Sequence, residues 1–108
     1  MRSINRVTLL GHLGADPDVK VTANKANLAT LNLATNQSWK DSEGNWQEKT
    51  EWHRVVCWDK IAEKAGENLK KGDPVFLEGL LTTRTWEDKE GEKHYVTEVI
   101  AKDIVPMG

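Results

Sequence analysis

Tryptophan is the residue type in this 108-residue sequence that most clearly points to chemistry. The chain has five tryptophans but only one Phe and one Tyr. A small domain normally fills its core with Leu, Val, Ile and Phe, because an indole is large and its N–H group needs a partner. We therefore expect several of these rings at the surface, where each offers a flat apolar face: Trp39, Trp46, Trp52, Trp58 and Trp86.

Positive side chains accompany the rings. Residues two apart in a strand share a face, so Trp52, Arg54 and Trp58 are expected to point one way and His53 the other. The same spacing places Arg84 beside Trp86. Alternating rings and cations suit sequence-independent binding of unpaired nucleic acid, because any base can stack, with roughly 1–3 kcal/mol per base. The alternative interpretation is that Trp52 and Trp58 fill a core.

A hairpin is predicted between residues 36 and 49, with Ser42–Asn45 as its turn. Trp39 would lie at its mouth with Lys40 beside it, and Trp46 near its tip. Trp46 either extends a stacking surface or merely covers the loop. We find no internal repeat.

The composition excludes several classes of protein. The formal charge is −2, so binding by bulk positive charge is disfavoured, and the placement of cations must matter instead. Cys57 is the only cysteine, and the three histidines have no Cys or Asp neighbours, so we predict no metal and no cofactor. No apolar run or secretory signal is present, so we expect no membrane association and a cytoplasmic location.

Carboxylates are scattered, with no paired nucleophile and base and no phosphate-binding glycine loop: Glu51, Asp59, Glu78 and Glu98. We therefore predict that the chain is not an enzyme.

Hydrophobic periodicity predicts strands around a single helix. The helix spans 59–71, with Asp59 as its cap and Lys70, Lys71 and Gly72 at its end. The predicted strands span 4–13, 18–22, 27–35, 50–58, 75–86 and 94–105. A helix between the third and fourth long strands is the order of an all-β OB-fold, a five-stranded Greek-key barrel. A generic small β-barrel is the alternative.

Several segments together resemble the bacterial single-stranded DNA-binding protein family over essentially the whole chain. They are MRSINRVTLLGHLGADPDV, TLNLATNQSW, KTEWHRVVCWDKIAEKAGENLKKGDPVFLEGLLTTRTW and YVTEV. The succession TEWHRVV, KIAE and LKKGDPVFLEG is specific to this family. The resemblance implies one OB domain over residues 1–108. It also implies a homotetramer that wraps and protects single-stranded DNA during replication, recombination and repair.

The resemblance also implies roles for individual residues. It implies that bases stack on Trp39, Trp52, Trp58 and Trp86, although the family more often has Phe at the position of Trp58. It implies that phosphates are contacted by Arg2, Lys40, Arg54, Lys60, Lys71 and Arg84. His53 matches a subunit-interface histidine, which we interpret as structural rather than as a pH switch. Thr82 and Thr85 stand where the family often has basic residues, so a lower affinity is expected.

Family members usually continue into a disordered linker and an acidic tip that recruits replication and repair proteins. This sequence stops at IVPMG, either because it is a trimmed piece or because it is a naturally tail-less member. Replication and repair proteins are therefore expected as partners only if the native protein has such a tail. Two alternatives within the fold are a dimeric replication-restart protein, which the tryptophan set disfavours, and a binder of RNA or oligosaccharide.

Overall fold

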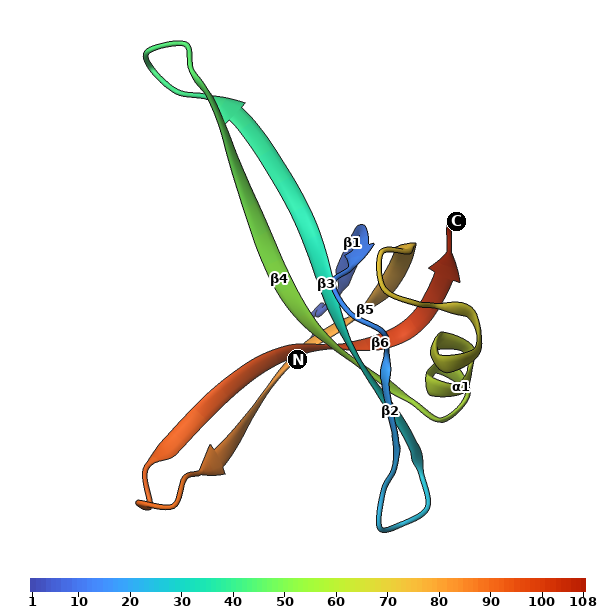
Figure 1. Cartoon of the computed structure of the whole chain (residues 1–108). Coiled ribbons are helices and arrows are strands. Elements are labelled where there is room, and N and C mark those ends of the chain that lie inside the picture. Colours follow the sequence, from blue (N-terminus) through green and yellow to red (C-terminus); the bar gives the residue numbers. More distant parts are fainter.

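The computed structural model describes all 108 residues, and its elements follow the predicted order of strands around one helix. Figure 1 shows a small barrel from which two long hairpins project in different directions. The elements are β1 (Val7–Leu13), β2 (Asp18–Val21), β3 (Asn27–Lys40), β4 (Trp46–Trp58), α1 (Asp59–Asn68), β5 (Pro74–Glu87) and β6 (Lys93–Pro106).

The sheet closes on itself. Its strand order is β1-β5-β6-β4-β3-β2, and a further pairing of β1 with β3 closes the five strands other than β2 into a barrel. Most neighbours are antiparallel, whereas β4 and β6 run parallel through Val55–Val99 and Val56–Ile100. The short β2 pairs with the first residues of β3. A closed barrel of five strands with one helix before β5 is the predicted OB-fold, and the prediction is confirmed.

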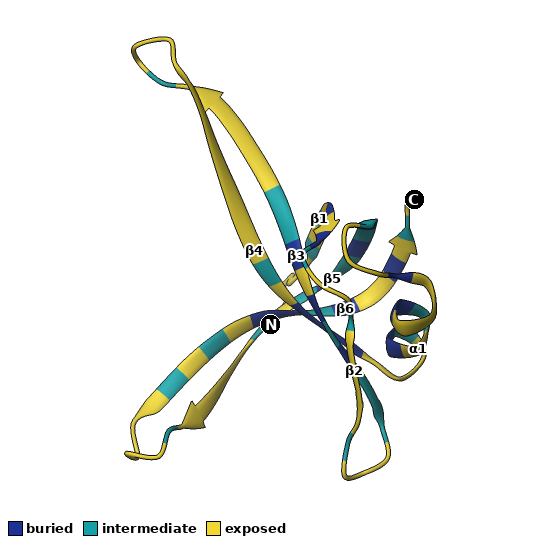
Figure 2. Ribbon diagram, in the orientation of Figure 1, coloured by how far each residue is buried: buried dark blue, intermediate teal, exposed yellow.

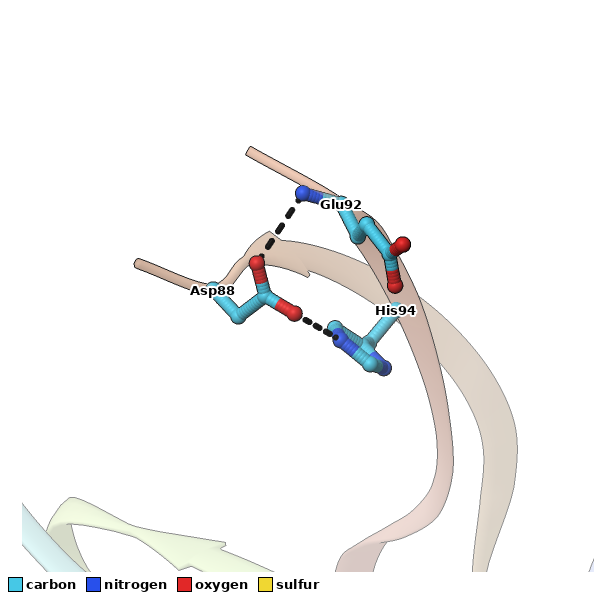
Figure 3. A group of neighbouring side chains, drawn as sticks. All are labelled: Asp88, Glu92 and His94. Carbon is cyan, nitrogen blue, oxygen red and sulfur yellow. Dashed lines mark hydrogen bonds and ion pairs between the residues drawn. The ribbon is translucent and has the colours of Figure 1, made fainter. Parts of the chain in front are cut away.

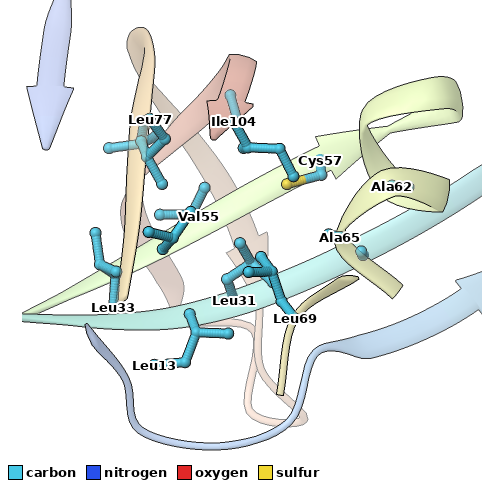
Figure 4. Packing of buried hydrophobic residues seen from close by; sticks show 14 residues of the cluster. Leu13, Leu31, Leu33, Val55, Cys57, Ala62, Ala65, Leu69, Leu77 and Ile104 are labelled. Carbon is cyan, nitrogen blue, oxygen red and sulfur yellow. The ribbon is translucent and has the colours of Figure 1, made fainter. Parts of the chain in front are cut away.

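Aliphatic residues and the single cysteine, Cys57, fill the barrel (Figure 4). Alternate residues of β3 and β4 point inward, including Leu31, Leu33 and Val55, and α1 adds Ala62 and Ala65 from one side. No tryptophan belongs to this cluster of 14 buried residues. The alternative that Trp52 and Trp58 fill the core is therefore wrong.

The hairpin strands are longer than the sequence predicts. β3 continues to Lys40 and β4 begins at Trp46, so most of the predicted loop at 36–49 is paired strand. The signal is hidden because both faces of the projecting ribbon meet solvent, which removes the alternation of apolar and polar residues. Figure 2 shows this part of the hairpin as almost entirely exposed.

The ends of α1 also differ from the prediction. Trp58 is the residue before the helix, and no side chain caps the first turn. Asp59 adopts a left-handed backbone with φ of 51°, so its carboxylate does not serve as the expected cap. The helix ends at Asn68, and Lys70–Asp73 form a separate turn in which the Asp73 N–H donates to the Lys70 carbonyl.

The two hairpins end in the same turn. In each, the first aspartate accepts backbone N–H groups two and four residues later, on Oδ1 of Asp41 and of Asp88. Gly44 and Gly91 then adopt positive φ values of 82° and 81°, which glycine allows without steric cost. The turns lie in matching stretches, WKDSEGNWQ (39–47) and WEDKEGEKH (86–94). The two stretches share the local turn pattern W-x-D-x-E-G, with four identical residues in nine.

Candidate nucleic-acid interface

All five tryptophans are exposed. Their exposed fractions run from 41% at Trp58 to 67% at Trp46. Surface indoles of this kind are unusual, because a ring left in water forgoes the apolar burial that makes tryptophan stabilising. The sequence-based expectation of outward rings is therefore met for every tryptophan in the chain.

Three strands carry a shared outward face. Trp52 and Arg54 lie on β4, and Arg84 and Trp86 lie on β5, each pair two residues apart. Between them runs β6, paired with β4 on one side and with β5 on the other. The register places Glu98 of β6 on this same face, because Thr82 lies directly opposite it and Arg84 is two residues further along.

Glu98 joins the two arginines. Its carboxylate accepts from Arg54 Nε at 3.0 Å and from Arg84 Nε at 3.1 Å. The Glu98 side chain is 7% exposed, whereas the guanidinium side chains are nearly half exposed. One buried carboxylate therefore holds two guanidinium groups at the surface and leaves a net positive charge there. Sequence analysis missed this role, because the sequence alone does not give the β4–β6 register.

An open groove runs beside these groups, lined by Arg54, Arg84, Trp86 and Val96. It combines an apolar ring with two cations, so it can take a flat aromatic group together with an anion.

Trp52 is positioned by a glycine from another part of the chain. Its ring lies on the backbone of Gly14, just after β1, and a Cβ added there would come within 2.6 Å of the indole Cη2 atom. Gly14, Ala15 and Asn32 line a hollow together with this ring. The close approach fixes where the indole lies and admits no larger residue at position 14 without displacing it.

The β3–β4 tip carries two tryptophans on opposite faces. Trp39 lies opposite Gln47 in the register, whereas Lys40 lies opposite Trp46. Lys40 Nζ is 5.4 Å from the centroid of the Trp46 ring, a cation–π contact. The expectation that Lys40 accompanies Trp39 is therefore wrong. Trp46 is the most exposed of the five tryptophans, which favours the interpretation that it extends a stacking surface.

At the β5–β6 tip, Trp86 has an aromatic partner. The His94 ring stacks on the indole with 4.4 Å between centroids and 20° between planes. His94 Nε2 shares a hydrogen bond of 2.8 Å with Asp88 Oδ2 (Figure 3). The sequence interpretation of His94 as isolated and without an acidic partner is wrong. The recurring turn pattern was the signal that could have found this pair.

The turn aspartates have lowered pKa values. At Asp88 the hydrogen bond with His94 is the largest cause of a pKa below the ordinary 3.8, followed by the Glu92 N–H. At Asp41 the N–H of Asn45 is the largest cause of the lowered pKa. Cys57 differs, because burial raises the pKa of its thiol to about 12 and leaves it unreactive.

Three possible metal-ligating groups gather at the β5–β6 tip. Ligand atoms of Asp88, Glu92 and His94 lie within 4.8 Å of one another. The hydrogen bonds at Asp88 already account for this arrangement, since one oxygen holds the turn amides and the other holds His94. The absence of a metal stays a prediction.

The remaining predicted residues are spread over the barrel. Trp58 and Lys60 lie at the junction of β4 and α1, both exposed. Lys71 lies in the turn after α1, where its backbone N–H donates to Asp16. Arg2 is exposed in the segment before β1. No contact joins Arg2, Lys60 or Lys71 to a tryptophan ring.

His53 points to the barrel side of β4, away from Trp52, as predicted. It is partly buried, and its Nε2 shares a hydrogen bond of 2.9 Å with Thr35 Oγ1. A histidine satisfied in this way fits the structural interpretation.

The single helix of the chain is too short and too polar to cross a membrane.

Comparison with known proteins gives a family match over nearly the whole chain. The model of the single-strand binding protein family matches residues 4–107. The single-stranded DNA-binding protein 1 of Xylella fastidiosa (strain 9a5c) is 48% identical over 109 residues, covering all of this chain and 80% of that protein. The protein of the same name from Chlorobaculum tepidum is 47% identical over 108 residues, covering 99% of this chain and 67% of that protein. These relatives are named for binding, which confirms that the chain is not an enzyme.

Solved structures agree with the family match. A complex of Plasmodium falciparum SSB with ssDNA aligns with a TM-score of 0.92 at 32% identity, covering 100% of this chain and 98% of the other. A deletion mutant of the single-stranded DNA-binding protein from Thermus aquaticus aligns with a TM-score of 0.85 at 37% identity. That alignment covers 97% of this chain and about half, 51%, of the Thermus aquaticus chain.

Proposed function

Because the chain belongs to the single-strand binding protein family, we propose that it binds single-stranded DNA without reading its sequence. The observation that carries the proposal is the outward face with Trp52 and Arg54 on β4 and Arg84 and Trp86 on β5. Arg54, Arg84 and Trp86 line one groove on this face. Bases stack on the two indoles, and the guanidinium groups bind the phosphates between them. Stacking accepts any base, so no base-edge hydrogen bonds are required.

Glu98 prepares this face for the ligand. It holds both guanidinium groups in place before DNA arrives, so less side-chain entropy is lost on binding. Its single charge leaves the pair of arginines with one net positive charge to offer to a phosphate. This arrangement gives a modest electrostatic contribution, in keeping with the overall charge of −2.

The other predicted residues extend the surface. Trp58 and Lys60 continue it toward α1, and Trp46 with Lys40 continues it along the β3–β4 hairpin. Trp39 takes part from the opposite face of that hairpin. Arg2 and Lys71 contact phosphates further along a wrapped strand.

The domain over residues 1–108 acts as a homotetramer in the cytoplasm and protects single strands during replication, recombination and repair. Exposed apolar residues support self-association, because a lone barrel leaves Leu10, Leu81 and Tyr95 in water. We assign His53 to a subunit interface, as the family resemblance implies. Light scattering is expected to give four subunits, and a monomer would contradict this part of the proposal.

Titration with oligo(dT) tests binding directly. Intrinsic tryptophan fluorescence is expected to be strongly quenched, because stacked bases contact the exposed indoles. Affinity should fall as NaCl rises, with a slope near 0.7 for each phosphate neutralised. Unchanged fluorescence at micromolar protein would refute the stacking mechanism, and an affinity independent of salt would indicate an uncharged ligand.

Trp52→Ala isolates the stacking contribution. It is expected to weaken binding to oligo(dT) at least about tenfold, since one stacked base is lost. Trp52→Phe is the matched control, because it retains a flat ring on Gly14 and should lose less affinity. Equal losses in the two variants would show that the ring face does not bind the base.

A further inference from the structure

The Trp86 indole is closed on one side. The His94 imidazole lies nearly parallel to it, with 4.4 Å between the ring centroids. A base could enter between the two rings only if they separated to roughly twice a stacking distance. This face of Trp86 is therefore occupied in the free protein.

The histidine is itself held in place. Its Nε2 bonds to one oxygen of Asp88, and the other Asp88 oxygen accepts the N–H groups of Glu90 and Glu92. The Gly91 N–H donates to the Asp88 carbonyl, which completes the turn. The backbone of the turn thus fixes the carboxylate, and the carboxylate fixes the imidazole (Figure 3).

The other side of the indole remains open. The groove beside Trp86 is lined by Arg54, Arg84 and Val96, and His94 does not line it. Trp86 therefore borders the two arginines, while the His94 ring covers one of its faces. A base stacked on the open face lies next to the guanidinium groups that would take its phosphate.

We infer that His94 is a positioning residue for Trp86: held by Asp88, it closes one face of the indole, so that this hairpin stacks a single nucleobase on the face that His94 leaves open. The inference rests on the proposed binding of single-stranded DNA. Gln47 occupies the corresponding place in the β3–β4 tip and bonds to Asp41, but it has no ring to close a face of Trp39.

NMR of the histidine ring protons tests whether DNA leaves the stack intact. The indole ring current is expected to shift the His94 signals upfield in the free full chain, and Trp86→Ala should abolish this shift. The chain has only three histidines, so the signals are assigned by their loss in His94→Ala. At saturation with oligo(dT) the shift is expected to persist. Return of the signals to unstacked positions would show that a base replaces His94 and would overturn the inference.

Substitutions of His94 test the ring separately from the hydrogen bond. His94→Ala is expected to weaken oligo(dT) binding about two- to tenfold through loss of the aromatic pair. His94→Gln keeps a bond to Asp88 and should behave like His94→Ala, whereas His94→Phe keeps the ring and should bind within about twofold of the parent. Unchanged or tighter binding by His94→Ala would overturn the inference.

Gln47→Ala is the matched control in the other hairpin. It removes the equivalent hydrogen bond without removing a ring, so affinity should change less than about twofold and the His94 signals should stay in place. The two proposals fail differently. If the parent chain does not bind oligo(dT), the proposed function fails. If it binds with quenched fluorescence while His94 leaves the indole, only the positioning role fails.

Discussion

The tip of the β3–β4 hairpin and the tip of the β5–β6 hairpin share their turn and differ in what faces their tryptophan. Each has a Trp two residues before the turn aspartate and a side chain bonded to that aspartate six residues after it. In β3–β4 the bonded side chain is the Gln47 amide, and in β5–β6 it is the His94 ring. The same backbone therefore presents Trp39 without a ring partner and Trp86 with one face covered.

The remaining positions of the tips also differ. Lys40 and Trp46 face each other in one hairpin as a cation–π pair, and Glu87 and Lys93 face each other in the other. The shared turn therefore sets only the backbone geometry of each hairpin tip. The two cross-strand pairs around it decide whether a tip presents rings, charges or both.

The strongest test removes the tryptophan from each tip. Trp86→Ala is expected to weaken oligo(dT) binding about tenfold, because this ring borders the arginine groove. Trp39→Ala should cost less, since Trp39 projects from the ribbon face opposite Trp46 and Trp52. Fluorescence titrations of both variants at one salt concentration provide the measurement. A larger loss for Trp39→Ala would reverse the proposed ranking of the tips.

The turn glycines test whether the backbones are equivalent. Gly44→Ala and Gly91→Ala each force a side chain into a positive φ, which costs about 1 kcal/mol or roughly fivefold in local opening. Hydrogen exchange of the Asn45 and Glu92 amides should accelerate by similar factors in the two variants. Gly66→Ala, in α1 with negative φ, serves as a control that leaves these amides unchanged. A clear difference between the two tips would mean that the shared turn is not equally strained.

Gln47→His gives Trp39 an aromatic partner at the position that His94 occupies beside Trp86. The new imidazole lies opposite Trp39 and within reach of Asp41, so it should stack on the indole as His94 does. The expected signs are an upfield shift of the new histidine signals and an affinity change of less than about twofold. If no upfield shift appears, features of β5–β6 beyond the shared pattern are needed to build the pair.

The smallest expected effect is a difference in acid titration. Both turn aspartates have folded pKa values below 3.8, so the stability that they contribute is present above that pH and is lost as pH falls through the folded value. His94→Ala should raise the Asp88 midpoint and leave that of Asp41 unchanged, because His94 is the largest cause at Asp88 alone. Carboxyl NMR titration measures both. An unmoved Asp88 midpoint would contradict the assigned cause.

Much of the fold follows from the sequence, because strands that line the barrel alternate apolar and polar residues. Leu31, Leu33 and Val55 illustrate this pattern, and the helix could be placed by the change of period. The strands of the outer half of the β3–β4 hairpin could not be predicted, because solvent on both faces leaves no alternation of apolar and polar residues.

The sequence predicted which residue types form the site, but it did not predict which of these side chains contact one another. The outward tryptophans followed from their number and from strand spacing. The link from Arg54 through Glu98 to Arg84 depends on the register between strands 44 residues apart in sequence. The stacking of His94 on Trp86 depends on the hairpin register, and the contact of Trp52 with Gly14 joins two elements that no local pattern connects.

The core contains no tryptophan, and this determines which optical signal reports unfolding and which reports binding. Every tryptophan is already 41–67% exposed and none belongs to the core cluster, so unfolding removes only partial cover from the indoles. Heat or urea denaturation should therefore change the emission wavelength little, while far-ultraviolet circular dichroism records loss of the barrel. A titration that follows emission reports on ligand contact with little interference from melting, which makes stability and binding separable in one sample.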